Sequence, residues 1–136
     1  MPVSISKELQ DFIAGKVAWV ATADQSGRPN LAPKGSLKVL DDQTLVFADL
    51  FSLKTRAALT RNPQVAVAVI ESGPPPVGYQ FKGSAELLEA GPIFERVKEG
   101  LQKAAPHLPA PKYAVKITVD SIYSLTPGPD AGKKIA

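Results

Sequence analysis

The residues best suited to binding an anion lie together in the run Ser52-Leu53-Lys54-Thr55-Arg56. Ser52 is a good helix N-cap residue, and the free N–H groups of a first helical turn point toward the helix start, where the helix dipole favours negative charge. Lys54 adds an ammonium group and Thr55 a hydroxyl donor. The run therefore predicts a phosphate cradle. It also fits an ordinary capped helix whose Lys54 and Arg56 face water.

A second run, Pro33-Lys34-Gly35-Ser36-Leu37-Lys38, is unusual for a strand. Its proline cannot donate a hydrogen bond to a sheet, and its glycine presents no side chain. Its two lysines and its serine share one face at a spacing of two residues. This pattern favours a surface on which a flat ligand lies against the backbone. The alternative is a solvent-facing edge strand that its lysines protect from aggregation.

Several classes of site are excluded by residue type. The chain has no cysteine, which rules out disulfides, thiolate nucleophiles and cysteine-based metal sites. The single histidine, His107, lies between prolines, and we expect it in an exposed loop. The sequence contains no H-x-x-x-H pattern, G-x-S-x-G elbow, P-loop or G-x-G-x-x-G turn, so we expect no metal site and no nucleotide site of those types.

Length and composition predict one soluble domain spanning residues 1–136, with residues 129–136 as an extended tail. The chain is 44% hydrophobic and 21% charged. Its net charge of +3 is small, and its only adjacent basic pair is in the tail, so we expect no binding to nucleic acid. It starts with no signal peptide and has no apolar run of the roughly 20 residues that span a bilayer. We therefore expect a cytoplasmic protein with no membrane contact.

Hydrophobic periodicity predicts a mostly β domain with a few helices. We expect a short helix after Ser6, a second helix starting at Ser52 and a third opening at Pro92, with Ile93, Val97 and Leu101 on one face. The expected strands are residues 17–23, 31–40, 44–49, 65–71, 78–89 and 113–125. Tight turns should join the first three strands into an antiparallel meander. The strand at 65–71 lacks polar alternation, so we expect both its faces to be buried. Six short strands argue for an antiparallel barrel.

Taken together, the motifs resemble a known family. They are NLAPKGSLKVL (30–40), LVFAD (45–49), KTR (54–56), RNP (61–63), FKGSA (81–85) and IYSLTPG (122–128). In this order they are similar to the pyridoxamine 5′-phosphate oxidase-like FMN-binding split barrels. The short single-domain members are the most similar, and the resemblance runs from Val17 to Gly128. It implies a six-stranded antiparallel split barrel.

The resemblance also implies a site and a partner. Members of the family form homodimers with FMN in two clefts at the interface. The residues that would line the isoalloxazine and ribityl chain are Pro33, Lys34, Gly35, Ser36 and Lys38. Lys54 and Thr55 would hold the phosphate, Asp49 would lie near the ribityl hydroxyls, and Gln80 would come from the other subunit.

The implied function is that of an FMN-binding flavoprotein, either an oxidoreductase or an electron carrier, with an unknown substrate. Three features depart from the family pattern. Ala57-Ala58 replaces an asparagine found in many relatives, no flavin-covering aromatic stands beside Lys34, and the tail lacks the Arg- and His-containing segment of full-length oxidases. We therefore do not expect true pyridoxamine phosphate oxidation. The alternatives are a split barrel that binds F420 or haem, and a dimeric binding protein without a cofactor.

Overall fold

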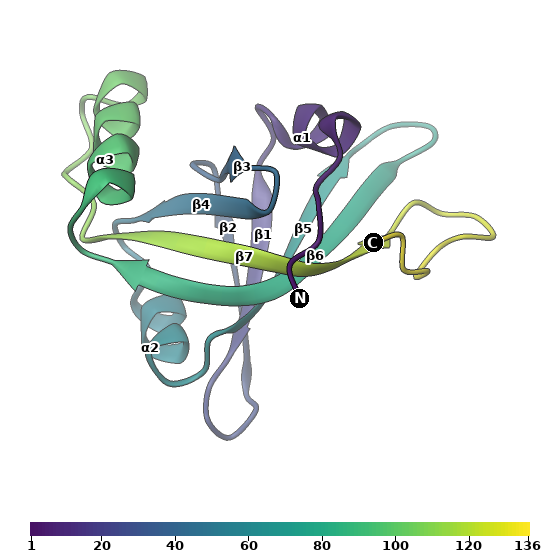
Figure 1. The fold of residues 1–136 in the computed structure, drawn as a ribbon, viewed down its shortest axis with the longest axis horizontal. Helices are drawn as coiled ribbons and strands as arrows, with labels where there is room; N and C mark the ends of the chain where they lie inside the picture. Colours follow the sequence, from purple (N-terminus) through teal and green to yellow (C-terminus); the bar gives the residue numbers. More distant parts are fainter.

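The computed structural model describes residues 1–136 as one antiparallel sheet of seven strands with three helices (Figure 1). This confirms the mostly β split-barrel class. The strand order is β2-β1-β5-β6-β7-β4-β3. The elements are α1 (Lys7–Ile13), β1 (Ala18–Ala23), β2 (Pro29–Lys34), β3 (Lys38–Asp41), β4 (Thr44–Asp49), α2 (Leu53–Arg61), β5 (Gln64–Glu71), β6 (Val77–Leu88), α3 (Pro92–Ala104) and β7 (Tyr113–Ser124).

The single strand expected at residues 31–40 is two strands, which raises the count from six to seven. β2 ends at Lys34 and β3 begins at Lys38, and the two lie at opposite edges of the sheet. Both predicted antiparallel pairings are present, β1 with β2 and β3 with β4, but the continuous three-strand meander is wrong because the two pairs lie at opposite edges. The chain turns at residues 35–36, and the Ser36 hydroxyl accepts a hydrogen bond of 3.0 Å from the Ala48 amide of β4. That bond and the buried side chain of Leu37 direct the chain to the far edge.

The sheet curls so that β1 and β2 pass behind β4 and β7, with the core between them (Figure 1). Phe47 and Phe81 are fully buried at its centre, within a cluster of 17 buried apolar residues. α1 adds Leu9 and Ile13 to this cluster. Ser6 caps α1 by accepting a hydrogen bond of 3.3 Å from the Leu9 amide. The short N-terminal helix was predicted correctly.

Strand β5 is buried on one face only, so the expectation of two buried faces is wrong. Val65, Val67 and Val69 point into the core, whereas Ala66 and Ala68 are half-buried and Ile70 is exposed. The reason is that no helix or second sheet of the chain covers the outer face of β5. The apolar residues on the outer face of β5 therefore form an apolar surface that no other part of the chain covers.

Strands β6 and β7 form the longest pair of the sheet, and their register shifts between Lys82 and Gly83. A Cβ atom at Gly83 would lie 2.0 Å from the carbonyl oxygen of Thr118, which is far inside van der Waals contact. Glycine is required here because the neighbouring backbone fills the space that a side chain needs. The irregularity lets both strands bend around the barrel.

The C-terminal residues turn back onto the barrel, whereas the sequence suggested an extended tail. Lys134 forms a bridge with Tyr123 of β7, and the Ile135 amide donates a hydrogen bond of 2.8 Å to the carbonyl of Ile122. The segment thereby covers part of the outer edge of β7. None of the three helices is both long and apolar enough to cross a membrane.

Candidate cofactor site

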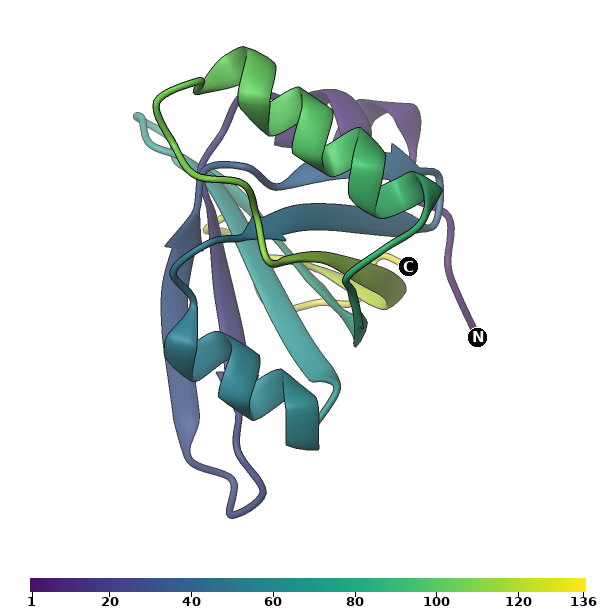
Figure 2. The same cartoon turned by 90° about the vertical axis from the view of Figure 1, so that its left-hand side faces the viewer.

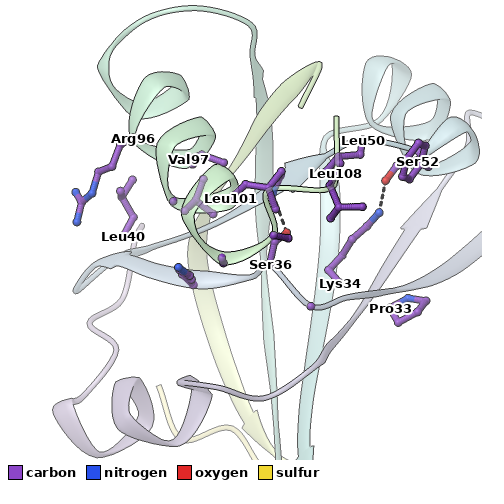
Figure 3. Close-up of a pocket in the computed structure, with 18 of the residues that line it drawn as sticks. Pro33, Lys34, Ser36, Leu40, Leu50, Ser52, Arg96, Val97, Leu101 and Leu108 are labelled. Atoms are coloured by element: carbon purple, nitrogen blue, oxygen red, sulfur yellow. Dashed lines mark hydrogen bonds between the residues drawn. The ribbon is translucent and has the colours of Figure 1, made fainter. Parts of the chain in front are cut away.

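A cavity of about 730 Å³ lies between helix α3 and the place where the chain crosses from β2 to β3 (Figure 3). Its volume falls within the range of roughly 300–1,000 Å³ that is usual for small-molecule sites. α3 and α2 lie at opposite ends of the view in Figure 2, and the start of α2 reaches the cavity through Ser52. The walls are mostly apolar side chains: Val39, Leu40, Val46, Ala48, Leu50, Phe51, Val97, Leu101, Ala104, Ala105 and Leu108.

Five of the nine residues predicted for the site line this cavity. They are Pro33, Lys34, Gly35, Ser36 and Lys38. Figure 3 shows Lys34 and Ser52 together at one end of the cavity and Arg96 beside Leu40 at the other. The run that looked unusual for a strand is thus the strand end and crossing that form one wall of the cavity.

The other four predicted residues do not line the cavity. Asp49 is buried at the end of β4, and Thr55 is buried in α2 with its hydroxyl accepting a 3.1 Å hydrogen bond from Asn30. Lys54 is exposed on the first turn of α2. Gln80 is half-buried on β6, in register with Ala68. Within one chain, these residues surround the start of α2 or lie away from the cavity.

Asp49 is held by an ion pair that joins β4 to α2. Its carboxylate accepts hydrogen bonds of 2.7 Å and 3.1 Å from the Arg56 guanidinium and one of 3.1 Å from the Ser52 amide. Burial raises the pKa of Asp49, but the hydrogen bonds and the charge of Arg56 outweigh it, so that the pKa lies below its usual value. Arg56 also stacks over the Tyr113 ring, 5.3 Å from its centroid. Asp49 therefore holds the start of α2 in place.

The N-terminus of α2 is free to bind an anion. Ser52 occupies the predicted N-cap position, but its side chain caps no helix amide and is instead hydrogen-bonded to the Lys34 amine. The amides of Lys54 and Thr55 have no backbone partner, as is usual in a first helical turn. Two N–H donors and the positive end of the helix dipole are thus available beside Lys34.

The Lys34 amine lies in a half-buried position at the cavity wall, 5.3 Å from the centroid of the Phe47 ring. Burial lowers its pKa. The Asp49 carboxylate opposes that effect and the Arg56 guanidinium adds to it, and the net result is a pKa below the usual value.

Sequence reasoning missed the contribution of α3 to the site. The predicted apolar face is confirmed in that Ile93, Val97 and Leu101 are all half-buried, and two of them line the cavity. Arg96 and Gly100 line it as well. The helical periodicity was a signal for a covered face, but nothing in the sequence indicated that this face covers the β2–β3 crossing.

The charge lining the cavity is entirely positive. Lys34, Lys38 and Arg96 line it, and none of its 19 lining residues is an aspartate or glutamate. None of the three cations takes part in an ion pair with a carboxylate. An apolar cavity with three unpaired cations is suited to a mostly apolar ligand that carries negative charge.

Known proteins resemble this chain in sequence and in fold. A family profile described as "Pyridoxamine 5'-phosphate oxidase" matches residues 5–126. The chain belongs to this family. Across 98% of its length it is 36% identical to the uncharacterized protein MJ0282 of Methanocaldococcus jannaschii, covering 89% of that protein. HupZ of Group A Streptococcus is 32% identical with a TM-score of 0.82, over 94% of this chain and 99% of HupZ.

Other solved structures that share the fold differ in the ligand that their names state. An FMN-binding protein from Syntrophomonas wolfei is 19% identical with a TM-score of 0.77, over 90% of this chain and 84% of its own. The haem storage protein HutZ of Vibrio cholerae and an F420 reductase are both 16% identical, with TM-scores of 0.67 and 0.68. At these identities the likeness shows the shared fold alone.

The Asp49–Arg56 pair generates a stability prediction. Replacing Arg56 by methionine leaves a buried carboxylate without its cation, which should lower the free energy of unfolding at pH 7 by about 2–4 kcal/mol. Since the pKa of Asp49 is lowered in the folded protein, the pair contributes stability above about pH 4 and loses it as the pH falls through the folded pKa. The deficit of Arg56→Met should therefore shrink below pH 4. Urea denaturation at pH 7 and at pH 3.5 measures the loss of stability and its dependence on pH.

The matched control is Lys7→Met. It removes the exposed pair of Lys7 with Asp11, whose side chains are 82% and 66% accessible, and it should change the free energy of unfolding by less than about 0.5 kcal/mol. A loss for Arg56→Met no larger than that of the control, or a loss independent of pH, would contradict the structural role of the pair.

Proposed function

We propose that this protein binds FMN in the cavity and works as a flavin-dependent oxidoreductase or electron carrier. The observation that carries the proposal is the lining of the cavity, which combines apolar walls with three unpaired cations and no carboxylate. An isoalloxazine ring fits the apolar walls in chemical character, and the phosphate of FMN fits the cations and the free amides at the start of α2.

Different residues of the chain would bind the ring and the phosphate of the cofactor. The backbone of Pro33, Gly35 and Ser36 forms an open wall for the ring, opposite the side chains of Val97 and Leu101. Lys54, with the amides of Lys54 and Thr55, would hold the phosphate near Ser52. The hydroxyl of Thr55 is already bonded to Asn30, so its backbone would make the contact.

Bound FMN supplies the hydride or electron transfer, and the protein contributes binding, orientation and electrostatics. Lys38 lines the cavity, and its charge would stabilise negative charge that develops on the ring. Asp49 lies behind the site, where its pair with Arg56 and its bond to the Ser52 amide fix the position of the phosphate-binding turn. The nature of the redox partner is left open by these residues.

We also propose a homodimer, supported by the open outer face of the sheet. Trp19, Leu31 and Ile70 are 43%, 63% and 48% exposed, and the strand registers bring them onto one face with Ala66 and Ala68. A contiguous apolar surface of this kind is typical of a protein interface. A two-fold axis through it would place the same face of each copy in contact. Gln80 lies on this side of the sheet, in register with Ala68, and would approach the partner's ligand.

The absorption spectrum of the freshly purified protein tests the cofactor directly. Two flavin bands, with FMN released on denaturation, are expected. A Soret band would instead identify haem, although the only histidine, His107, is exposed and is not part of the cavity wall. A bound deazaflavin would identify F420. A colourless protein that also fails to bind added FMN would contradict the proposal and favour a cofactor-free binding protein.

Lys54→Ala tests the phosphate contact. It should weaken FMN binding by about 1.5–3 kcal/mol, the usual contribution of a hydrogen bond to a charged group. Riboflavin binding should change much less, because riboflavin has no phosphate. Titration calorimetry at one fixed salt concentration measures both ligands, and Arg61→Ala at the other end of α2 is the control. Equal losses for both ligands would show that Lys54 is structural.

Trp19→Glu tests the proposed interface. A charge in the centre of the outer apolar face should convert a dimer into a monomer, because burying an unpaired carboxylate is strongly unfavourable. Sedimentation at micromolar concentration gives the oligomeric state. Ile135→Glu changes another half-exposed apolar residue, at 50% exposure, and should leave the dimer intact. A wild-type protein that sediments as a stable monomer would refute both the dimer and a shared site.

A further inference from the structure

The Lys34 amine is the half-buried cation of the cavity wall, whereas Lys38 and Arg96 are exposed to solvent. The one hydrogen-bond partner of Lys34 is the neutral hydroxyl of Ser52. The nearby acid, Asp49, is occupied by two hydrogen bonds from Arg56 and one from the Ser52 amide. A half-buried amine with no carboxylate partner is poorly stabilised in its charged form.

The surroundings of Lys34 disfavour its charged form on balance. Arg56 lies on α2 and Asp49 on β4, and the effect of burial together with the Arg56 charge outweighs the attraction of Asp49, so that the pKa of Lys34 is lowered. The positive end of the α2 dipole also faces this region. The Phe47 ring lies 5.3 Å from the amine, and this cation–π contact favours the charged form but supplies no counter-ion. Desolvation combined with a neighbouring cation is the setting that makes lysine amines nucleophilic.

We propose that Lys34 is a nucleophilic amine that forms an imine with an aldehyde entering the cavity. This reaction goes beyond FMN binding and does not depend on it. The unprotonated Nζ attacks the carbonyl carbon, a C–N bond forms, and the carbonyl oxygen takes up a proton to give a carbinolamine. Loss of the nitrogen proton and of that oxygen as water then gives the C=N bond. No electrons are gained or lost in the sequence.

Ser52 is placed to assist this reaction. Its hydroxyl contacts Nζ and is free of any capping bond to α2, so it can pass a proton between the amine and the departing oxygen. The cavity admits a molecule of moderate size, and its walls of Val97, Leu101 and Leu108 are apolar. No aspartate or glutamate lines the cavity to return Lys34 to a stable ion pair.

Reductive trapping on the full-length protein tests the proposal. The purified chain is incubated at pH 7 with pyridoxal, a chromophoric aldehyde without a phosphate group, and then treated with sodium borohydride. Peptide mass spectrometry measures labelling at each lysine. Lys34 should be labelled several-fold faster than the exposed Lys7, because the lowered pKa of Lys34 leaves more of its amine unprotonated at neutral pH. Ser52→Ala should slow trapping at Lys34 and leave labelling of Lys7 unchanged.

Lys34→Arg retains the positive charge and should abolish the fast-labelling site, while Lys103→Arg, at the exposed end of α3 and outside the cavity wall, should leave it. Labelling of Lys34 no faster than that of Lys7 would overturn the proposal, and so would fast labelling that persists in Lys34→Arg.

A parallel incubation with FMN separates this proposal from the proposed cofactor. Protection of Lys34 by FMN supports both. Fast labelling that FMN does not affect supports the reactive amine and argues against FMN at this end of the cavity.

Discussion

The buried side chain of Leu37 and the hydrogen bond from the Ala48 amide to Ser36 fix how the chain crosses between the two edges of the sheet. This crossing keeps the barrel split, because β2 and β3 remain unpaired with each other. The cavity lies at the split, with the crossing as one wall and α3 as another. A continuous strand over residues 31–40 would close this space, so the site depends on the break.

The electrostatics of the site depend on the ion pair between Asp49 and Arg56. The Asp49 carboxylate is the only buried acid in the protein, and Arg56 occupies it. Lys34 is consequently left without an acidic partner, and the start of α2 adds further positive potential. A protein can maintain this excess of positive charge in a partly apolar space when a bound anion offsets it. The Asp49–Arg56 ion pair therefore affects which ligand the cavity can bind.

Membership of the pyridoxamine 5′-phosphate oxidase family establishes the architecture without selecting the ligand. Proteins that share the fold are named for FMN, haem and F420. Function on a shared fold is decided by the side chains of the site. In this chain the decisive features are a cation-lined cavity, a histidine outside it, and an α3 helix whose half-buried apolar face closes one side.

The sequence by itself determined the class of the fold, the three helices and five of the cavity residues. Local signals were sufficient there: Ser6 and Ser52 mark helix starts, alternating residues mark strands, and Pro33 with Gly35 marks an unusual strand end. These features depend on backbone preferences within a few residues, which a sequence displays directly.

Only the tertiary structure decided the placement of β2 and β3 at opposite edges of the sheet, the exposed outer face of β5, and the use of α3 as a cavity wall. Each depends on contacts between residues far apart in the chain. Asp49 illustrates the point, because its sequence position suits contact with a ligand, but Arg56 seven residues later turns back and binds it. Whether a ligand or Arg56 donates hydrogen bonds to this carboxylate is set by the packing of α2 against the sheet. No local pattern in the sequence encodes that outcome.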